Sequence, residues 1–136
     1  MANPPGTYLI EFNDGTPSLH TGQGTLLQDH SFRAPAGNDQ IFIFAIQDPQ
    51  IHYSQPPGPE PIAWFNIAVE PIERPADIEP SFSVDRMVLT LHVDPPPDLA
   101  FDLVFRFKLF FDNGLSLGPD DGVKPLDPTI IEKPPD

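Results

Sequence analysis

Hydrophobic and polar residues alternate most clearly in the segment AFDLVFRFKLFF, residues 100–111. A period of two is the period of a β-strand, and six apolar positions in this register are inconsistent with a helix. We predict a strand with one apolar face, formed by Phe101, Leu103, Phe105, Phe107, Leu109 and Phe111. The opposite face, which is partly solvated, carries Arg106, Lys108 and Phe110.

Other runs of the same kind predict further strands. Residues 7–12 and 85–93 alternate in the same way, the latter with Met87, Leu89, Leu91 and Val93 on one face. The run IFIFAI at 41–46 is apolar throughout, which favours a central strand buried on both faces. Weaker runs predict strands at 24–28, 62–70, 115–117 and 129–131, the last at a sheet edge. Residues 31–33 either continue the 24–28 strand or turn a corner.

Turn and breaker residues separate these runs. Asn13-Asp14-Gly15-Thr16 and Asn113-Gly114 are strong hairpin signals. Residues 71–80 contain three prolines, so we expect no regular element of any length there. Seven or eight short strands without a helical period predict a single domain, 1–136, with an antiparallel, immunoglobulin-like β-sandwich fold. A small closed β-barrel is the alternative, and we expect the chain to be frayed from about residue 132.

Composition narrows the functions that this domain can have. Seven basic and 20 acidic residues give a net charge of −13, which repels phosphate backbones and anionic lipid. We therefore expect no nucleic-acid partner and no membrane partner. The chain has no cysteine, which excludes disulfides and thiol chemistry, and 20 prolines, which stiffen its loops. No signal peptide and no apolar run of spanning length is present, so a cytoplasmic location is the expectation.

No catalytic motif accompanies this pattern, so we expect a protein that is not an enzyme and holds no cofactor. Its four histidines, His20, His30, His52 and His92, lack zinc-site spacing, and only a spatial pairing of His52 and His92 with a carboxylate could bind a metal. Acidic loops suggest calcium as a further alternative. Its candidate ligands are Asp112, Asn113, Asp120, Asp121 and Asp127.

The proline-rich segment QDPQIHYSQPPGPEPIAWF, residues 47–65, contains a P-x-x-P pattern but no adjacent Lys or Arg. We interpret it as a stiff connector between two strands. It positions His52, Tyr53 and Trp64, which could form an aromatic platform for a carbohydrate or another small ligand. The alternative is that Trp64 anchors the core.

Two dipeptides carry a family resemblance. Asp48-Pro49 follows one predicted strand, and Glu70-Pro71 follows the strand that contains the tryptophan. In these dipeptides and in its size, the chain resembles the bacterial DP-EP family of small proteins. The resemblance implies an all-β bacterial protein of unknown role and transfers no site residues.

These observations favour a non-catalytic acidic domain that acts by protein–protein binding or by self-assembly. The contact would involve another protein or a second copy of the chain. Residues Arg106, Lys108 and Phe110 are the candidate contact residues, because an exposed aromatic ring between cations is typical of an interaction face. The simpler interpretation is that the two cations pair with acids across strands.

Overall fold

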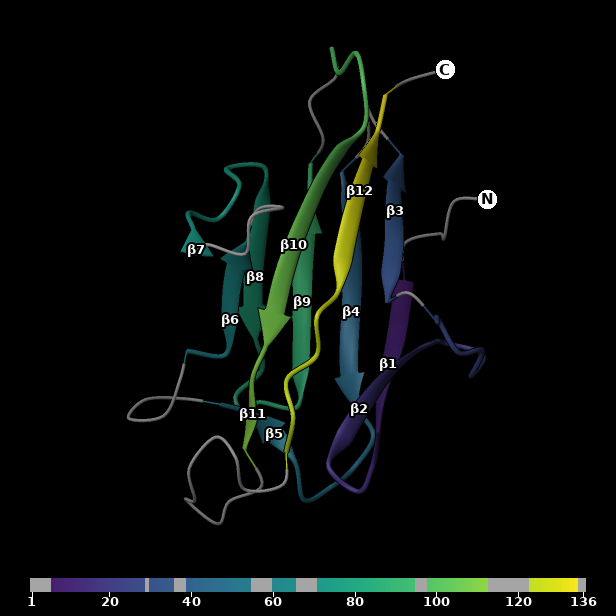
Figure 1. Ribbon diagram of the computed structural model, residues 1–136, viewed down its shortest axis with the longest axis vertical. Helices are drawn as coiled ribbons and strands as arrows, with labels where there is room; N and C mark the ends of the chain where they lie inside the picture. Colours follow the sequence, from purple (N-terminus) through teal and green to yellow (C-terminus); the bar gives the residue numbers. More distant parts are fainter. Residues whose placement is uncertain are drawn as a thin grey trace.

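The structure is a computed structural model, and it describes residues 6–28, 30–35, 39–54, 60–65, 71–94, 98–112 and 123–134. All regular elements in these ranges are β-strands (Figure 1). The described part of the chain accordingly has no helix of the length and apolarity needed to cross a bilayer.

Two five-stranded sheets make up most of the molecule. The first sheet has the order β2-β1-β4-β9-β8. Its strands are β1 (Gly6–Asn13), β2 (Thr16–Thr21), β4 (Gln40–Ile46), β8 (Ile78–Phe82) and β9 (Val88–Val93). The second sheet has the order β3-β12-β10-β6-β7. Its strands are β3 (Ser31–Pro35), β6 (Ile62–Phe65), β7 (Pro71–Ile72), β10 (Leu103–Leu109) and β12 (Thr129–Lys133). A short ladder joins β5 (His52–Tyr53) to β11 (Phe111–Asp112).

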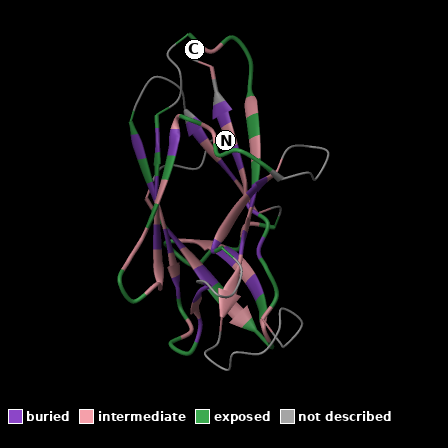
Figure 2. Cartoon of the chain, turned by 90° about the vertical axis from the view of Figure 1, so that its left-hand side faces the viewer, coloured by how far each residue is buried: buried purple, intermediate pink, exposed green. Residues whose placement is uncertain are grey.

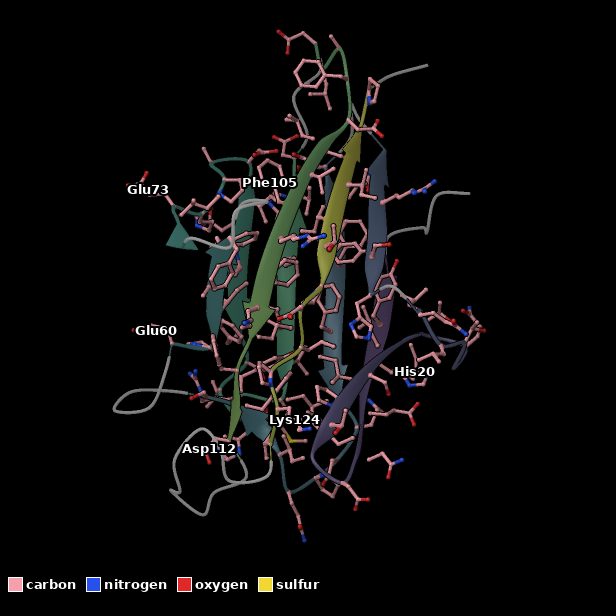
Figure 3. All side chains as sticks on the ribbon, in the orientation of Figure 1. His20, Glu60, Glu73, Phe105, Asp112 and Lys124 are labelled. Atoms are coloured by element: carbon pink, nitrogen blue, oxygen red, sulfur yellow. The ribbon has the colours of Figure 1, made fainter. Side chains whose placement is uncertain are left out.

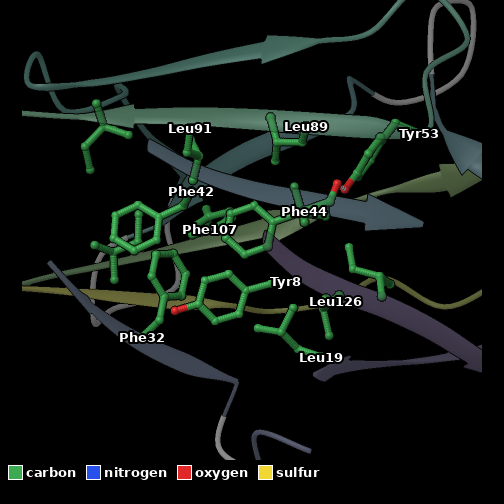
Figure 4. Close-up of a cluster of buried hydrophobic side chains, with 14 of the residues drawn as sticks. Tyr8, Leu19, Phe32, Phe42, Phe44, Tyr53, Leu89, Leu91, Phe107 and Leu126 are labelled. Atoms are coloured by element: carbon green, nitrogen blue, oxygen red, sulfur yellow. Dashed lines mark hydrogen bonds between the residues drawn. The ribbon is translucent and has the colours of Figure 1, made fainter. Parts of the chain in front are cut away.

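The core lies between the two sheets and is rich in aromatic rings (Figure 4). Phe32 of the second sheet lies 4.9 Å from Phe42 and 5.6 Å from Tyr8 of the first, measured between ring centroids. Along most strands, buried positions alternate with more exposed ones (Figure 2). Rings packed across two half-buried sheets give a β-sandwich, as predicted. Because both sheets are open, with edge strands β2, β8, β3 and β7, the closed-barrel alternative is wrong.

The sheets are mixed, whereas the sequence predicted antiparallel pairing throughout. β1 runs parallel to β4, and β3 runs parallel to β12. Between β1 and β4 the chain passes through β2 in the same sheet and then β3 in the opposite sheet, so it can return to β1 in the same direction. Local sequence patterns do not record such a crossover.

The strand at 41–46 is central, but it is buried on one face only. Phe42 and Phe44 are fully buried, whereas Ile41 is 51% exposed. The outer face of the first sheet has no covering layer within the described residues, so its apolar side chains remain at the surface. The prediction of burial on both faces is therefore wrong.

The predictions for two further segments, residues 24–28 and 71–80, are also wrong. The second strand begins directly after the Asp14-Gly15 turn, at Thr16, and residues 24–28 contribute only an isolated bridge between His20 and Leu26. Residues 71–80 contain β7 and the beginning of β8, despite their prolines. β8 is an edge strand, and a sheet edge tolerates proline because the missing N–H can face away from the neighbouring strand.

β12 lies between β3 and β10. The prediction that residues 129–131 form an edge strand is therefore wrong. β12 extends to Lys133, and Glu132 is fully buried. The predicted strand at 115–117, the Asn113-Gly114 turn and the end of the 62–70 strand lie outside the described residues.

The 100–111 segment forms two strands. Phe101 is 67% exposed, and β10 covers only Leu103–Leu109. At Phe110 the backbone N–H donates to Pro61 O and the carbonyl accepts from Ser54 N–H, so the chain leaves the second sheet there to pair with β5. The side chains of Phe107, Leu109 and Phe111 all lie in the core or pack against it. The inward alternation therefore continues across this break.

Candidate functional site

Positive charge is distributed unequally between the two sheets. Four of the seven Lys and Arg residues of the chain lie in strands of the second sheet, namely Arg33, Arg106, Lys108 and Lys133. The strands of the first sheet contain no Lys or Arg, and they carry Glu11 and Glu79. The second sheet therefore has a basic surface on a molecule whose net charge is −13.

Strand register places these cations beside apolar groups. Arg33 lies opposite Ile131, which in turn lies opposite Val104. In the next outward row, Thr129 lies opposite Arg106, which lies opposite Phe65. Since the inward positions of these strands are filled by core residues, this outward set forms one surface. We call it the basic face; it consists of Arg33, Phe65, Val104, Arg106, Lys108 and Ile131.

The contacts of these cations are few. Lys108 Nζ lies 3.9 Å from Asp127 Oδ1 and 5.3 Å from the centre of the Phe65 ring. This contact agrees with the simpler interpretation that Lys108 pairs with an acid. Within the described part of the chain, neither Arg33 nor Arg106 forms an ion pair. Val104 is 47% exposed beside them.

The other arginines have structural roles. Arg86 donates from Nε to Tyr53 O at 3.1 Å and from Nη2 to Ser54 O, and it thereby fixes β5. Arg74 donates from Nη1 to Ile78 O at the beginning of β8. Because these guanidinium groups satisfy backbone carbonyls, they are poorly placed to bind a partner. Arg33 and Arg106 of the basic face differ from them, because neither forms an ion pair with a described residue.

Phe110, the third predicted contact residue, is half-buried at the break that follows β10. Its backbone is held on both sides by hydrogen bonds to Pro61 and Ser54. It follows Lys108 on the outward side of the strand, and so it extends the basic face towards β11. It is not the freely exposed ring that the sequence suggested.

The predicted aromatic platform does not form at the surface. Tyr53 is fully buried, and its hydroxyl donates a 2.9 Å hydrogen bond to Phe44 O (Figure 4). Trp64 is 6% exposed and packs on Phe107, with 5.1 Å between the ring centroids. Both rings point into the core because they occupy inward positions of their strands. Only His52 remains half-exposed, so these three residues offer no ring face on which a sugar could stack.

The predicted metal ligands are described in part. Asp112, which is labelled at the lower end of Figure 3, pairs with His52 across β11 and β5. Asp127 lies beside Lys108. Asn113, Asp120 and Asp121 lie outside the described residues. His92, on the first sheet, has its Nε2 3.0 Å from Asp39 Oδ1. Among the described residues no three His, Asp or Glu side chains gather in a metal-binding group.

Sequence reasoning missed two polar features. On the outer face of the first sheet, His20 Nε2 lies 2.8 Å from Ser18 Oγ, and its Nδ1 lies 3.7 Å from Glu11 Oε2. The second distance exceeds a hydrogen bond, so we interpret this group as a cross-strand polar contact.

The other missed feature is Glu132, which is fully buried beside Asp77. Burial is the main cause, and the neighbouring Asp77 carboxyl group adds to it, so the pKa of Glu132 is raised to about 9. The alternation of Ile130 and Glu132 within TIIEK would have placed this carboxyl group on the inward face.

Comparisons of the chain with protein-family models, with curated proteins and with solved structures found no match. The resemblance to the DP-EP family therefore stays a prediction.

Proposed function

We propose that this protein is a non-catalytic binding domain that associates with acidic protein surfaces through its basic face. The observation that supports this most strongly is the presence of Arg33 and Arg106 beside the exposed Val104, without an ion-pair partner among the described residues. Apolar area supplies most of the binding free energy of such contacts, and charge complementarity supplies specificity and a faster association rate.

The partner to which we commit is a second copy of the chain. Its first sheet has exposed Ile41 together with Glu11 and Glu79, and lacks Lys and Arg in its strands. Net charge opposes association of two copies, but the Debye length is about 8 Å at physiological ionic strength, so contacts at the face outweigh distant repulsion. Because the two outer faces lie on opposite sides of the sandwich, such a contact would be heterologous and could continue from copy to copy.

Sedimentation velocity over a concentration series tests this proposal. The wild-type sedimentation coefficient should rise with concentration, and Arg106→Glu should abolish the rise. Lys124→Glu is the matched control, because it makes the same charge change at an exposed residue away from the basic face. A monomer at every concentration, or equal effects of the two variants, would contradict self-association through this face.

The wider setting of this function is also part of the proposal. The immunoglobulin-like class and the cytoplasmic location are carried over from the sequence analysis, and the bacterial origin is carried over from the resemblance to the DP-EP family. The carbohydrate-binding alternative is not retained, since burial of Tyr53 and Trp64 removes its platform.

A further inference from the structure

Buried oxygen atoms without hydrogen donors lie at one end of the sandwich. Both carboxyl oxygens of Glu132 and Oδ2 of Asp77 are buried and have no hydrogen-bond partner in the described part of the chain. Glu132 is fully buried, whereas Asp77 is half-exposed in the turn before β8. Buried polar atoms of this kind are rare in proteins, and each calls for a physical explanation.

The two carboxyl groups come from opposite sheets and interact with each other at one end of the sandwich. Glu132 lies in the second sheet between Leu103 and Ala34. Asp77 precedes Ile78, which pairs with the last residue of β9, Val93. Val93 also pairs with Gln40, the first residue of β4, and Gln40 is 6% exposed. These residues all occupy the end of the sandwich at which β12 ends, the upper end of Figure 1.

Either a shared proton or a bound divalent cation could compensate the burial of these two carboxyl groups. One shared proton would let Glu132 donate a single hydrogen bond to Asp77, and the second oxygen of Glu132 would stay buried without a donor. A divalent cation would contact all three oxygens and would displace the proton, so its two charges would match those of the two carboxylates. The count of oxygens and charges therefore favours the cation.

We propose that Glu132 and Asp77 form a calcium site that joins the two sheets at this end of the sandwich. Glu132 would bind with both oxygens and Asp77 with Oδ2. The described residues bring no third Asp, Glu or His to this pair, so amide, backbone or water oxygens would complete the shell. Calcium accepts six to eight such oxygens in flexible geometry, whereas magnesium requires near-ideal octahedral geometry.

The turn that holds Asp77 gives the ion a path to the site, because Asp77 is half-exposed. Two further charged residues, Asp94 and Arg74, lie beside this turn. The backbone N–H of Asp94 donates to Asp77 O at 2.9 Å, and Arg74 is occupied by the Ile78 carbonyl. The site is separate from Asp112 and Asp127. Asp112 follows the last residue of β10 and Asp127 precedes the first residue of β12, so both lie at the end of these strands away from Glu132.

Thermal unfolding of chelator-treated protein at pH 8 tests the proposal, with calcium chloride and magnesium chloride added separately. Saturating calcium should raise the Tm of the wild type by about 5 °C or more. Glu132→Gln keeps the shape of the side chain and should lose this rise, as should Asp77→Asn. Glu79→Gln removes an exposed acid of β8 and should retain it.

A second measurement does not depend on stability. Calorimetric titrations in buffers of different ionisation enthalpy should show that calcium binding to the wild type releases a proton from the acid pair. The absence of a calcium effect on the wild type would overturn the site, as would an equal effect on Glu132→Gln. A larger effect of magnesium than of calcium would overturn the choice of ion. None of these outcomes depends on self-association, so the site can fail while the proposed function stands.

Discussion

The hydroxyl of Tyr53 donates a 2.9 Å hydrogen bond to the backbone carbonyl of Phe44 inside the core. This bond links β5 to the central strand of the first sheet. The ring packs at the same time between Phe82, at 5.1 Å, and Phe111, at 5.5 Å. Burial raises the pKa of Tyr53 well above its ordinary value, so the hydroxyl stays protonated and remains a donor. A residue that the sequence suggested for ligand binding thus fixes the small β5–β11 ladder to the sandwich.

Tyr53→Phe should lower the free energy of unfolding by about 1–2 kcal/mol, because the buried Phe44 carbonyl loses a donor while the packing is kept. Tyr53→Ala should cost at least about 3 kcal/mol, since it also leaves a cavity. Urea unfolding followed by circular dichroism measures both values. A Tyr53→Phe variant as stable as the wild type would show that the hydrogen bond adds nothing to stability.

The turn between β1 and β2 predicts a backbone effect. Asp14 has φ 53° and Gly15 has φ 77°, which fits the two-residue hairpin turn in which both central residues are left-handed. Gly15→Ala should destabilise the protein by about 1–2 kcal/mol, because a Cβ disfavours this conformation. Asp14→Gly is the control; it relieves the same strain and should change stability little. Thermal unfolding compares the two, and an unchanged Tm for Gly15→Ala would contradict the turn geometry.

Glu132 predicts how stability varies with pH in calcium-free buffer. Its pKa is raised from 4.5 to about 9 in the folded state, so between these values the folded protein holds a proton that the unfolded chain has released. The stabilising contribution is therefore complete below about pH 4.5 and is lost as the pH rises towards 9. Unfolding midpoints measured from pH 5 to 9 should fall for the wild type.

Glu132→Gln should flatten this dependence, because the amide cannot ionise. Glu79→Gln should follow the wild-type profile, since that residue is exposed. If Glu132→Gln and the wild type lose stability in parallel, another group controls the alkaline side of the profile.

Alternation along single strands was predictable from the sequence. The inward residues Leu89, Leu91 and Val93 of β9 are all fully buried, as their period of two indicated. Phe107 and Leu109 likewise follow the 100–111 pattern, and the Asp14-Gly15 turn lies where its residues indicated. These features depend on interactions between near neighbours in the chain, which a sequence pattern records directly.

The sequence by itself thus determined that the chain forms a β-sandwich, with the positions and inward faces of its best alternating strands. Tertiary structure alone decided that β12 lies inside the second sheet, that β1 and β4 run parallel, and that Tyr53 and Trp64 belong to the core. It also decided that Glu132 meets Asp77, 55 residues earlier in the chain, and that all four Lys and Arg residues within the described strands lie in one sheet. The physical reason is that strand order, sheet assignment and charge pairing depend on hydrogen bonds and packing between residues far apart in the chain, which leave no local period.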